Sequence, residues 1–332
     1  MENLIVTGGL GFIGSNFIHH ILRSREDLRI TNIDYKGLGS NPANVQETKD
    51  NKRYRFVKGN LADYAFMLRA LKGARTVVNF AAQTHVDRSI ANPEPFFESN
   101  LKGAYNLFQS ALKNKVTRLI HISTDEVYGS ADSGSFDEKS PLNPSSPYSA
   151  TKASADLMAH AWKTTFELPV VILRCTNNFG PRQHPEKFIP KTIIRALDGK
   201  TIPLYGGGRQ IRDWIYVNDF CTAVERAIEN AVPGEVYNIS AGNELSNKEV
   251  AERLLKQIGL ASAKLTSVED RPGHDFRYSL NSEKARRSLG WKPAQTFEEG
   301  LTKTVNWYRE NVSWWKPLAT PKILSEAPWK EG

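Results

Sequence analysis

The stretch Leu4-Ile5-Val6-Thr7-Gly8-Gly9-Leu10-Gly11-Phe12-Ile13-Gly14 contains the pattern that decides the fold. A short apolar run, typical of a buried strand, precedes glycines at positions 8, 11 and 14 and a helical pattern that Phe12 and Ile13 open. Glycines at this spacing allow a tight turn, a close approach of the backbone to a pyrophosphate, and packing of the helix on the strand. The free N–H groups of the first helical turn would face the phosphates. We predict a dinucleotide-binding turn that uses Gly8, Gly11, Phe12, Ile13 and Gly14.

An acidic residue follows at the position where such a turn needs one. Asp34 stands at the end of the next apolar run, twenty residues after Gly14. A carboxylate there can accept both ribose hydroxyls of adenosine and repels a 2′-phosphate, so NAD is favoured over NADP. Lys36, two residues on, is a cation that keeps NADP open as an alternative.

The alternation of strand and helix continues through the first half of the chain. Apolar, β-branched runs occur at 29–33, 54–57, 76–80, 118–123 and 170–174. Amphipathic helical stretches between them cover 16–24, 65–71, 93–114 and 148–166. This order predicts an α/β fold with a doubly wound, Rossmann-type parallel sheet.

A stretch rich in Asn, Gly and Pro at 175–190 marks the start of a second, smaller domain. Shorter strand candidates follow at 202–204, 214–217 and 236–239. We expect an NAD-binding domain over residues 1–176 with return segments near 212–240, a mixed substrate-binding domain over 177–316, and an irregular surface tail over 317–332. Trp314, Trp315 and Trp329 are interpreted as packing anchors.

Composition narrows the classes of function. The 332 residues are 40% hydrophobic and 24% charged, as in an ordinary globular protein. The net charge of +8 comes from scattered Lys and Arg, which does not indicate nucleic acid and suits a small anionic substrate. Only Cys175 and Cys221 are present, which favours a reducing compartment, the cytoplasm. No apolar run approaches the roughly 20 residues of a membrane span, and no histidine spacing indicates a metal site, so we expect neither membrane nor metal.

Tyr148 and Lys152 lie four residues apart at the start of a helix that Ser145, Ser146 and Pro147 announce. That spacing places both side chains on one face of the helix. A lysine ammonium beside a phenol favours phenolate, and a positive nicotinamide ring would add to this effect. We therefore expect Tyr148 to titrate below its reference pKa of about 10 and to act as a base on an alcohol that loses hydride.

The segment Ser123-Thr124-Asp125-Glu126-Val127-Tyr128-Gly129 directly follows the strand predicted at 118–123. Ligands of open α/β sheets bind beyond the carboxyl ends of the strands. Two neighbouring acids at such a place suit an elimination, because one can remove a carbon-bound proton while the other, protonated, donates to the departing hydroxyl. A plain epimerase has no use for this pair, so Asp125 and Glu126 favour a dehydratase.

These motifs together resemble the extended, nucleotide-sugar branch of the short-chain dehydrogenase/reductase superfamily, and specifically the dTDP-glucose 4,6-dehydratase family. The resemblance runs through nearly the whole chain. Further matching motifs are Ala81-Ala82-Gln83-Thr84-His85-Val86-Asp87-Arg88-Ser89, Asn177-Asn178-Phe179-Gly180-Pro181, Pro185-Glu186-Lys187-Phe188-Ile189-Pro190, Arg212-Asp213-Trp214 and Asp270-Arg271-Pro272-Gly273-His274-Asp275.

The resemblance implies a role for each of these positions. Thr124 would hold the sugar's 4-oxygen, Tyr148 with Lys152 would act as base at the 4-hydroxyl, Asp125 as acid at the 6-hydroxyl, and Glu126 as base at C5. Additional NAD contacts would come from Asn60, Leu61, Ala81 and Ala82. The nucleotide sugar would be bound by Thr84, Asn178, Lys187, Phe188, Pro203, Tyr205, Arg212, Asn247, Arg271 and His274. The family also implies a homodimer formed through two helices of the cofactor domain, and a place in deoxysugar biosynthesis such as that of rhamnose.

The sequence departs from the family pattern at three places. Gln83 stands where many members have Glu, Asn60 replaces the usual Asp near the adenine, and residues 35–41 after Asp34 differ from the common run. An amide oxygen at residue 60 can still accept from the adenine amino group, although the charge is lost. We expect these departures to affect cofactor affinity and not the use of a cofactor.

Three alternatives remain from the sequence alone. The substrate could be UDP-glucose, because the choice between thymine and uracil depends on the shape of the pocket near Tyr205. The enzyme could be a nucleotide-sugar 4-epimerase or UDP-glucuronate decarboxylase, which typically carry Ser or another small residue where this chain has Asp125. A non-catalytic dinucleotide-sensing or RNA-associated protein on the same fold would need none of Tyr148, Lys152, Asp125 and Glu126.

Overall fold

The computed structural model describes residues 2–330. A seven-stranded sheet lies at its centre, in the order β10-β6-β5-β4-β1-β2-β3, and every pair in it is parallel. Its strands are β1 (Glu2–Thr7), β2 (Leu28–Asp34), β3 (Tyr54–Lys58), β4 (Thr76–Asn79), β5 (Arg118–Thr124), β6 (Val170–Cys175) and β10 (Val236–Ile239). The predicted Rossmann-type sheet is confirmed.

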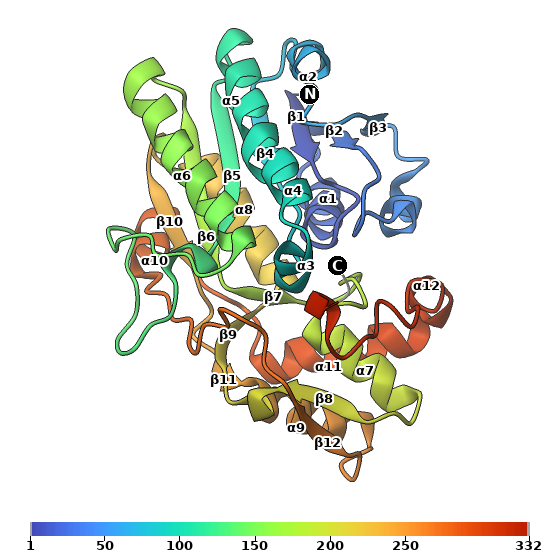
Figure 1. Cartoon of the computed structure of the whole chain (residues 1–332). Coiled ribbons are helices and arrows are strands. Elements are labelled where there is room, and N and C mark those ends of the chain that lie inside the picture. Colours follow the sequence, from blue (N-terminus) through green and yellow to red (C-terminus); the bar gives the residue numbers. More distant parts are fainter. Residues whose placement is uncertain (1, 331–332) are drawn as a thin grey trace.

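Helices cover both faces of this sheet (Figure 1). They include α1 (Phe12–Ser24), α2 (Tyr64–Ala70), α3 (Val86–Ala91), α4 (Glu94–Phe96), α5 (Gly103–Lys113), α6 (Pro147–Phe166) and α8 (Val217–Asn230), with 3₁₀ turns η1 (Pro42–Thr48) and η3 (Asp125–Tyr128). Between α4 and α5 lies a π-helical turn, η2 (Phe97–Lys102), within the stretch predicted as one helix. Residues before and after it are helical.

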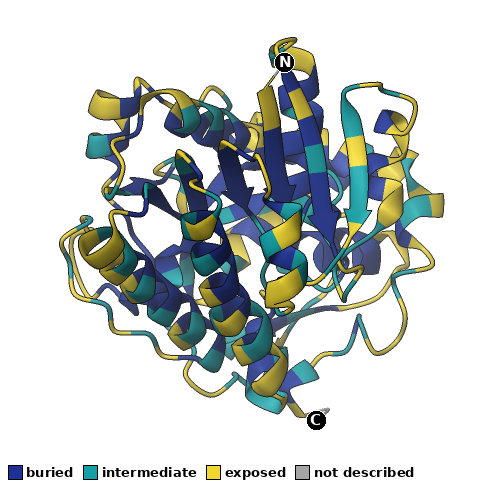
Figure 2. Cartoon of the chain, turned by 90° about the horizontal axis from the view of Figure 1, so that it is seen from above, coloured by how far each residue is buried: buried dark blue, intermediate teal, exposed yellow. Residues whose placement is uncertain are grey.

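The alternation of side chains along each strand explains the two layers. Leu4 and Val6 of β1 pack in the core on the side of α1 and α8, whereas Ile5, between them, packs in the core on the side of α2, α5 and α6. A strand covered on both faces is apolar at most positions, and β1 is buried from Leu4 to Thr7. Figure 2 shows the buried strands enclosed between helices whose outer faces are exposed.

A second core lies below the carboxyl ends of the strands in Figure 1. It is built by a three-stranded sheet, β11-β9-β7, a two-stranded sheet, β12-β8, and the helices around them. Its elements are β7 (Asn177–Phe179), α7 (Phe188–Leu197), β8 (Ile202–Tyr205), η4 (Gly206–Gly208), β9 (Ile211–Tyr216), β11 (Glu244–Ser246), α9 (Asn247–Ile258), β12 (Leu265–Val268), α11 (Phe297–Glu310) and α12 (Val312–Trp315). We propose that this unit is the substrate-binding domain.

The path of the chain between the two units differs from the expectation in two places. The predicted return segment near 212–240 begins only at α8, because β9 pairs with β7 and β11 of the small sheet. A second return was not predicted: α10 (Glu283–Leu289) and Trp291 pack in the core beside α1 and α8, where the indole N–H donates to the carbonyl of Asp219 at 2.9 Å.

The tail expected at 317–332 is described as far as residue 330; residues 331–332, and Met1 of the predicted first domain, lie outside the described residues. The tail has no long helix or strand, only η5 (Pro328–Lys330), but Leu324 and Trp329 in it are buried. Among residues 2–330, no helix combines the length and the apolar character that crossing a membrane requires.

Candidate active site

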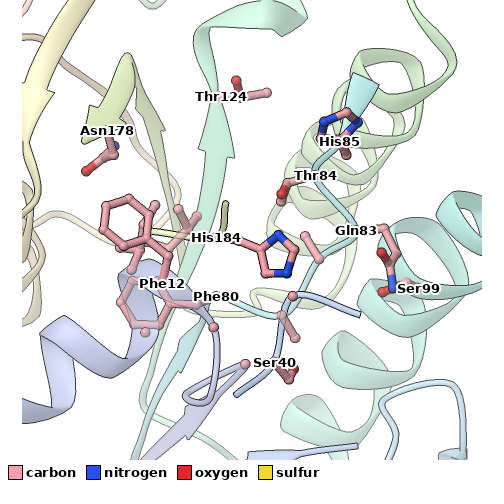
Figure 3. A pocket seen from close by; sticks show the side chains of 18 of the residues that line it. Phe12, Ser40, Phe80, Gln83, Thr84, His85, Ser99, Thr124, Asn178 and His184 are labelled. Carbon is pink, nitrogen blue, oxygen red and sulfur yellow. The ribbon is translucent and has the colours of Figure 1, made fainter. Parts of the chain in front are cut away.

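Two adjoining pockets lie where the central sheet meets the second core. The first runs along the carboxyl ends of β1, β2, β4 and β5 and is lined by every residue predicted to bind NAD or to be catalytic. The second lies toward the small sheets, and Thr84, Glu126 and Lys187 line both. Figure 3 looks into the first pocket, with Phe12 and Asn178 on one side, Thr84 and His85 on the other, and Thr124 at the end of its strand.

The glycine turn leaves room for a dinucleotide and cannot accept side chains. Gly8 has φ +71, and a Cβ on it would lie 2.5 Å from the backbone nitrogen of Ala81. A Cβ on Gly14 would lie 2.5 Å from the carbonyl oxygen of Gly8. Helix α1 begins with no side-chain cap and no acidic residue in its first turn. These N–H groups and this clearance fit the pyrophosphate of NAD.

Asp34 is buried and held by three donors. Its oxygens accept from the backbone N–H of Leu10 at 3.1 Å and of Lys36 at 2.9 Å, and from the hydroxyl of Ser40 at 2.8 Å. These bonds fix the carboxylate at the rim of the first pocket. The ammonium of Lys36 lies over the ring of Phe56, 5.4 Å from its centroid. The arrangement favours a ribose with free hydroxyls, as in NAD, over a 2′-phosphate.

Gln83 and Asn60, two of the three departures from the family pattern, each form a local hydrogen bond. Gln83 donates from its side-chain amide to the hydroxyl of Tyr35 at 2.6 Å, which joins the loop after β4 to the loop after β2. Asn60 is exposed, and its side-chain oxygen accepts from the backbone N–H of Ala62 at 2.9 Å. Leu61 beside it is buried. Tyr35, which was not predicted as a site residue, lines the first pocket together with Gln83.

The loop that carries Ala81 and Ala82 is fixed by the π-helical turn. The side chain of Asn100 accepts from the backbone N–H of Gln83 at 2.8 Å and donates to its carbonyl at 3.0 Å. The same amide donates to the hydroxyl of Thr151 on α6 at 3.0 Å. Asn100 thus ties the cofactor loop to the helix that carries Tyr148. The sequence offered no signal for this role beyond a polar residue inside an amphipathic helix.

Tyr148 and Lys152 lie at the start of α6, whose Ser146 forms a capping box with Ser149. Both side chains line the first pocket, as predicted. The expected lowering of the tyrosine pKa is wrong for the protein groups alone. Burial and the charge of Glu126 hold the pKa of Tyr148 well above its usual value. The ammonium of Lys152 donates to the carbonyl of Ile122 at 2.7 Å. This ammonium was expected to stabilise the phenolate, but it is hydrogen-bonded to the backbone.

Asp125 and Glu126 follow the end of β5 and differ in their electrostatic surroundings. Thr124 accepts from the backbone N–H of Glu126 at 3.3 Å and donates to Asp125 at 3.1 Å. Burial, reinforced by the neighbouring Glu126, raises the pKa of Asp125 well above its usual value. Burial also raises the pKa of Glu126, but Arg271, Arg212 and Lys187 oppose that rise. Both pKa values are therefore raised, but only Glu126 has three cations that oppose the effect of burial, which suits a division of roles into acid and base.

The second pocket is organised around Asp87, which was not predicted as a site residue. Its carboxylate accepts from Arg271 at 2.8 Å and from the hydroxyl of Tyr205 at 3.0 Å. Burial opposes ionisation of Asp87, but the Arg271 guanidinium lowers its pKa overall. The imidazole of His274 forms a hydrogen bond with Asp270 at 2.6 Å. Burial, Arg271 and Arg212 lower the pKa of this histidine to about 4. Three predicted substrate residues are thus held by carboxylates: Tyr205 and Arg271 by Asp87, and His274 by Asp270.

The remaining predicted substrate residues line one or the other pocket. Lys187 donates to the carbonyl of Thr84 at 2.7 Å, and Arg212 stacks 4.0 Å from the ring centroid of Tyr278 while donating to backbone carbonyls. Asn178 lies in the first pocket, whereas Phe188, Pro203 and Asn247 line the second. Within residues 2–330, the buried side-chain oxygen of Asn178, one oxygen of Asp125 and the Nε of Arg271 have no hydrogen-bond partner. Such buried groups fit sites that a polar ligand completes.

A buried ion pair lies behind the catalytic helix. Arg174 bonds Asp156 at 2.9 Å, and Asp156 stands one turn after Lys152 on α6. Burial lowers the pKa of Lys152, and the charge of Asp156 opposes that effect. The sequence could not indicate this pair, because its members lie on different elements. In the described part of the chain, no group of three or more His, Cys, Asp or Glu side chains is placed to hold a metal ion.

The fold, the glycine turn, the Tyr148 and Lys152 pair and the two acids define an NAD-dependent enzyme of the extended short-chain dehydrogenase/reductase class. The family model described as GDP-mannose 4,6 dehydratase matches residues 5–304, and the chain belongs to this family.

Particular relatives narrow the comparison. The chain is 43% identical to a dTDP-glucose 4,6-dehydratase of Streptomyces niveus over 99% of each sequence. It is 45% identical to the low-salt glycan biosynthesis protein Agl12 of Haloferax volcanii, covering 92% of this chain and 98% of that protein. Among solved structures, DesIV, a dTDP-glucose 4,6-dehydratase of Streptomyces venezuelae with NAD and TYD bound, matches with a TM-score of 0.93 at 45% identity, covering 95% of this chain and 99% of that one.

The raised pKa of Asp125 predicts a pH-dependent stability difference. A carboxyl whose pKa is higher in the folded than in the unfolded chain stabilises the fold below its ordinary value of 3.8, and this contribution is lost as the pH rises through the folded pKa. The Asp125→Asn variant has no such loss. Its thermal midpoint, measured from pH 4.5 to pH 8, should therefore gain on that of the native protein as the pH increases.

Asp137→Asn is the matched control, because the pKa of this exposed carboxyl is lowered by its bond to Ser140 and titrates below the tested range. Its difference from the native protein should stay constant with pH. A constant difference for Asp125→Asn as well would contradict the raised pKa.

Proposed function

We propose that the chain is an NAD-dependent dTDP-glucose 4,6-dehydratase that converts dTDP-glucose to its 4-keto-6-deoxy derivative and water. The observation that carries the proposal is the acid pair Asp125 and Glu126, which follows the end of a central strand and lines one pocket with Tyr148. The relatives of Streptomyces niveus and Streptomyces venezuelae carry this name, and DesIV was solved with NAD bound. An epimerase would need the tyrosine but not a buried protonated acid.

NAD, when bound along Gly8–Gly14 and Asp34, supplies the hydride acceptor at C4 and the hydride donor at C6. Tyr148 takes the proton of the 4-hydroxyl, while Thr124 bonds the 4-oxygen. The resulting 4-ketone makes the C5 proton acidic. Glu126 removes that proton, and Asp125 protonates the 6-oxygen, which leaves as water. A proton returns to C5 after C6 has gained hydride, so the net change is the loss of one water.

Because the pKa of Tyr148 is high in the protein alone, charges in the bound complex would have to lower it before Tyr148 can act as a base. Lys152 lines the same pocket, and the positive ring of oxidised nicotinamide would add to its field, so phenolate would be favoured only while the oxidised cofactor is present. Arg271, Arg212 and Lys187 face the same cavity and suit the two phosphates of the substrate. These cations also oppose the rise that burial causes in the pKa of Glu126.

The direct test is incubation with dTDP-glucose, and separately with UDP-glucose, without added reductant. We expect dTDP-glucose to give a product lighter by one water, with an alkali-sensitive 4-keto chromophore and no accumulation of free NADH. A strong preference for UDP-glucose would replace the nucleotide in the proposal. Only epimerised or decarboxylated sugar would contradict the dehydratase.

Variants of the acid pair serve as the controls of this assay. Asp125→Asn and Glu126→Gln should each lower kcat by roughly 100- to 10,000-fold, the usual contribution of a general acid or base, while the bound NAD content stays native. Normal dehydration in both variants would contradict their roles.

We also infer that two chains associate through the outer faces of α5 and α6, which lie side by side in Figure 1. Large apolar side chains are exposed there: Tyr105, Leu157 and Phe166, with Phe97 on the adjoining η2. Leu157 is 61% exposed in a helix whose other face is buried in the core. Two such helix pairs related by a twofold axis would form a four-helix interface between copies.

Sedimentation should therefore give a mass near twice the 37.3 kDa of one chain. Leu157→Glu should reduce this mass to that of one chain, because a charge would be buried between apolar helices. Val232→Glu is the matched control at another exposed apolar position, and it should keep the dimer. Equal masses for both variants would contradict this interface.

The location and pathway are part of the proposal. Cys175 and Cys221 are free and buried, which is typical of a protein of the reducing cytoplasm. The 4-keto-6-deoxy product is a precursor of deoxysugars such as rhamnose, and the relative Agl12 carries a name from glycan biosynthesis.

A further inference from the structure

The tail segment, residues 320–330, follows a fixed path along α7. Arg195 donates from its guanidinium to the carbonyl of Leu324 at 3.0 Å and pairs with Glu326 at 2.8 Å. Lys191, one turn earlier on the same helix, donates to the carbonyl of Ser325 at 3.0 Å. Leu324 itself is buried in the second core. The segment is therefore anchored before it reaches the pockets.

Beyond these anchors, the tail segment brings Trp329 against Tyr205. The indole is only 8% exposed, and its ring lies edge-on to that of Tyr205 with centroids 4.8 Å apart and an interplanar angle of 87°. Tyr205 lines the second pocket, whereas Trp329 is not among the residues that line it. Trp329 therefore supports the side of Tyr205 that faces away from the cavity.

Tyr205 is held from other directions as well. Its hydroxyl donates to Asp87, and its ring meets that of His274 edge-on with centroids 6.3 Å apart. Asp87 also binds Arg271. The Tyr205 ring is thus linked to Arg271, through Asp87, and to His274, and both of these residues line the same pocket.

The tail segment contacts the other walls of this pocket too. Its turn η5 packs on α3, the helix that carries Asp87, and the ammonium of Lys330 lies 2.5 Å from Glu269, next to Asp270. Asp270 in turn holds His274. Figure 1 shows the red end of the chain returning from α12 past α7 to α3. One short segment thus touches the strand, the helix and the loop that surround the pocket.

We propose that Trp329 is a positioning residue for the nucleotide-binding pocket, fixing the ring of Tyr205 and with it the affinity for the nucleoside diphosphate part of the substrate. This inference rests on the proposed function. Trp329 touches neither the acid pair nor the glycine turn, so the chemical step and cofactor binding do not depend on it.

The test is Trp329→Ala in the full chain, with dTDP-glucose as substrate and dTDP as a binding probe. Loss of an edge-to-face contact predicts a KM for dTDP-glucose and a Kd for dTDP that rise about five- to tenfold. We expect kcat within about twofold of native, and an unchanged NAD content. Trp329→Phe should restore most of the affinity. Lys322→Ala, at an exposed position of the same segment, is the matched control and should behave as the native chain.

An unchanged KM and an unchanged Kd for dTDP in Trp329→Ala would overturn the inference. So would a fall in kcat and NAD content in both Trp329→Ala and Trp329→Phe, since that pattern marks a residue needed only for folding. If the native chain does not dehydrate dTDP-glucose, the proposed function fails. The calorimetric Kd for dTDP then still decides the role of Trp329.

Discussion

Two carboxyls that share the end of one buried strand impose the main electrostatic constraint on this molecule. Burial disfavours charge on both, and their proximity disfavours charge on both at once. Arg271, Arg212 and Lys187 oppose the rise in the pKa of Glu126, whereas the pKa of Asp125 is held well above its usual value. These cations come from the second unit, so the electrostatic surroundings of the acid pair depend on both units.

Other groups around the acid pair serve the same division of charge. Asp87 holds Arg271 in place, and Lys152 is anchored to the strand that carries the acids. Phenolate at Tyr148 is opposed by burial and by Glu126, which links deprotonation of the substrate hydroxyl to the presence of positive charge nearby. In the proposed mechanism, Tyr148 would therefore act as a base only once the oxidised cofactor adds its positive charge.

Local patterns made much of the architecture predictable. The strands were predictable from short β-branched runs, because both faces of a parallel sheet are covered and most positions are therefore apolar. The glycine turn was predictable because only glycine fits at positions 8 and 14, where a Cβ would lie 2.5 Å from a backbone atom. Tyr148 and Lys152 were readable because i and i+4 positions share a helix face. The acid pair was readable from its place after a strand.

Features that depend on long-range contacts were not predictable from local pattern. The return of residues 283–291 to the first core, the clamp made by Asn100 and the pairing of Asp87 with Arg271 join segments far apart in sequence. For the protein groups alone, the pKa of Tyr148 was predicted in the wrong direction, because helix spacing reveals neither the burial of the phenol nor the nearby charge of Glu126. Trp329 was correctly read as an anchor, but its neighbour Tyr205 could not be inferred.

The central claim is that oxidation, elimination and reduction follow one another on a single sugar within one site. The most direct measurement is turnover of dTDP-glucose carrying deuterium at C4, without added cofactor, followed by NMR and mass analysis of the product. The account predicts that the deuterium is recovered at C6 of a 4-keto sugar that is one water lighter. Deuterium lost to solvent, or retained at C4 of a sugar that keeps its 6-hydroxyl, would contradict it.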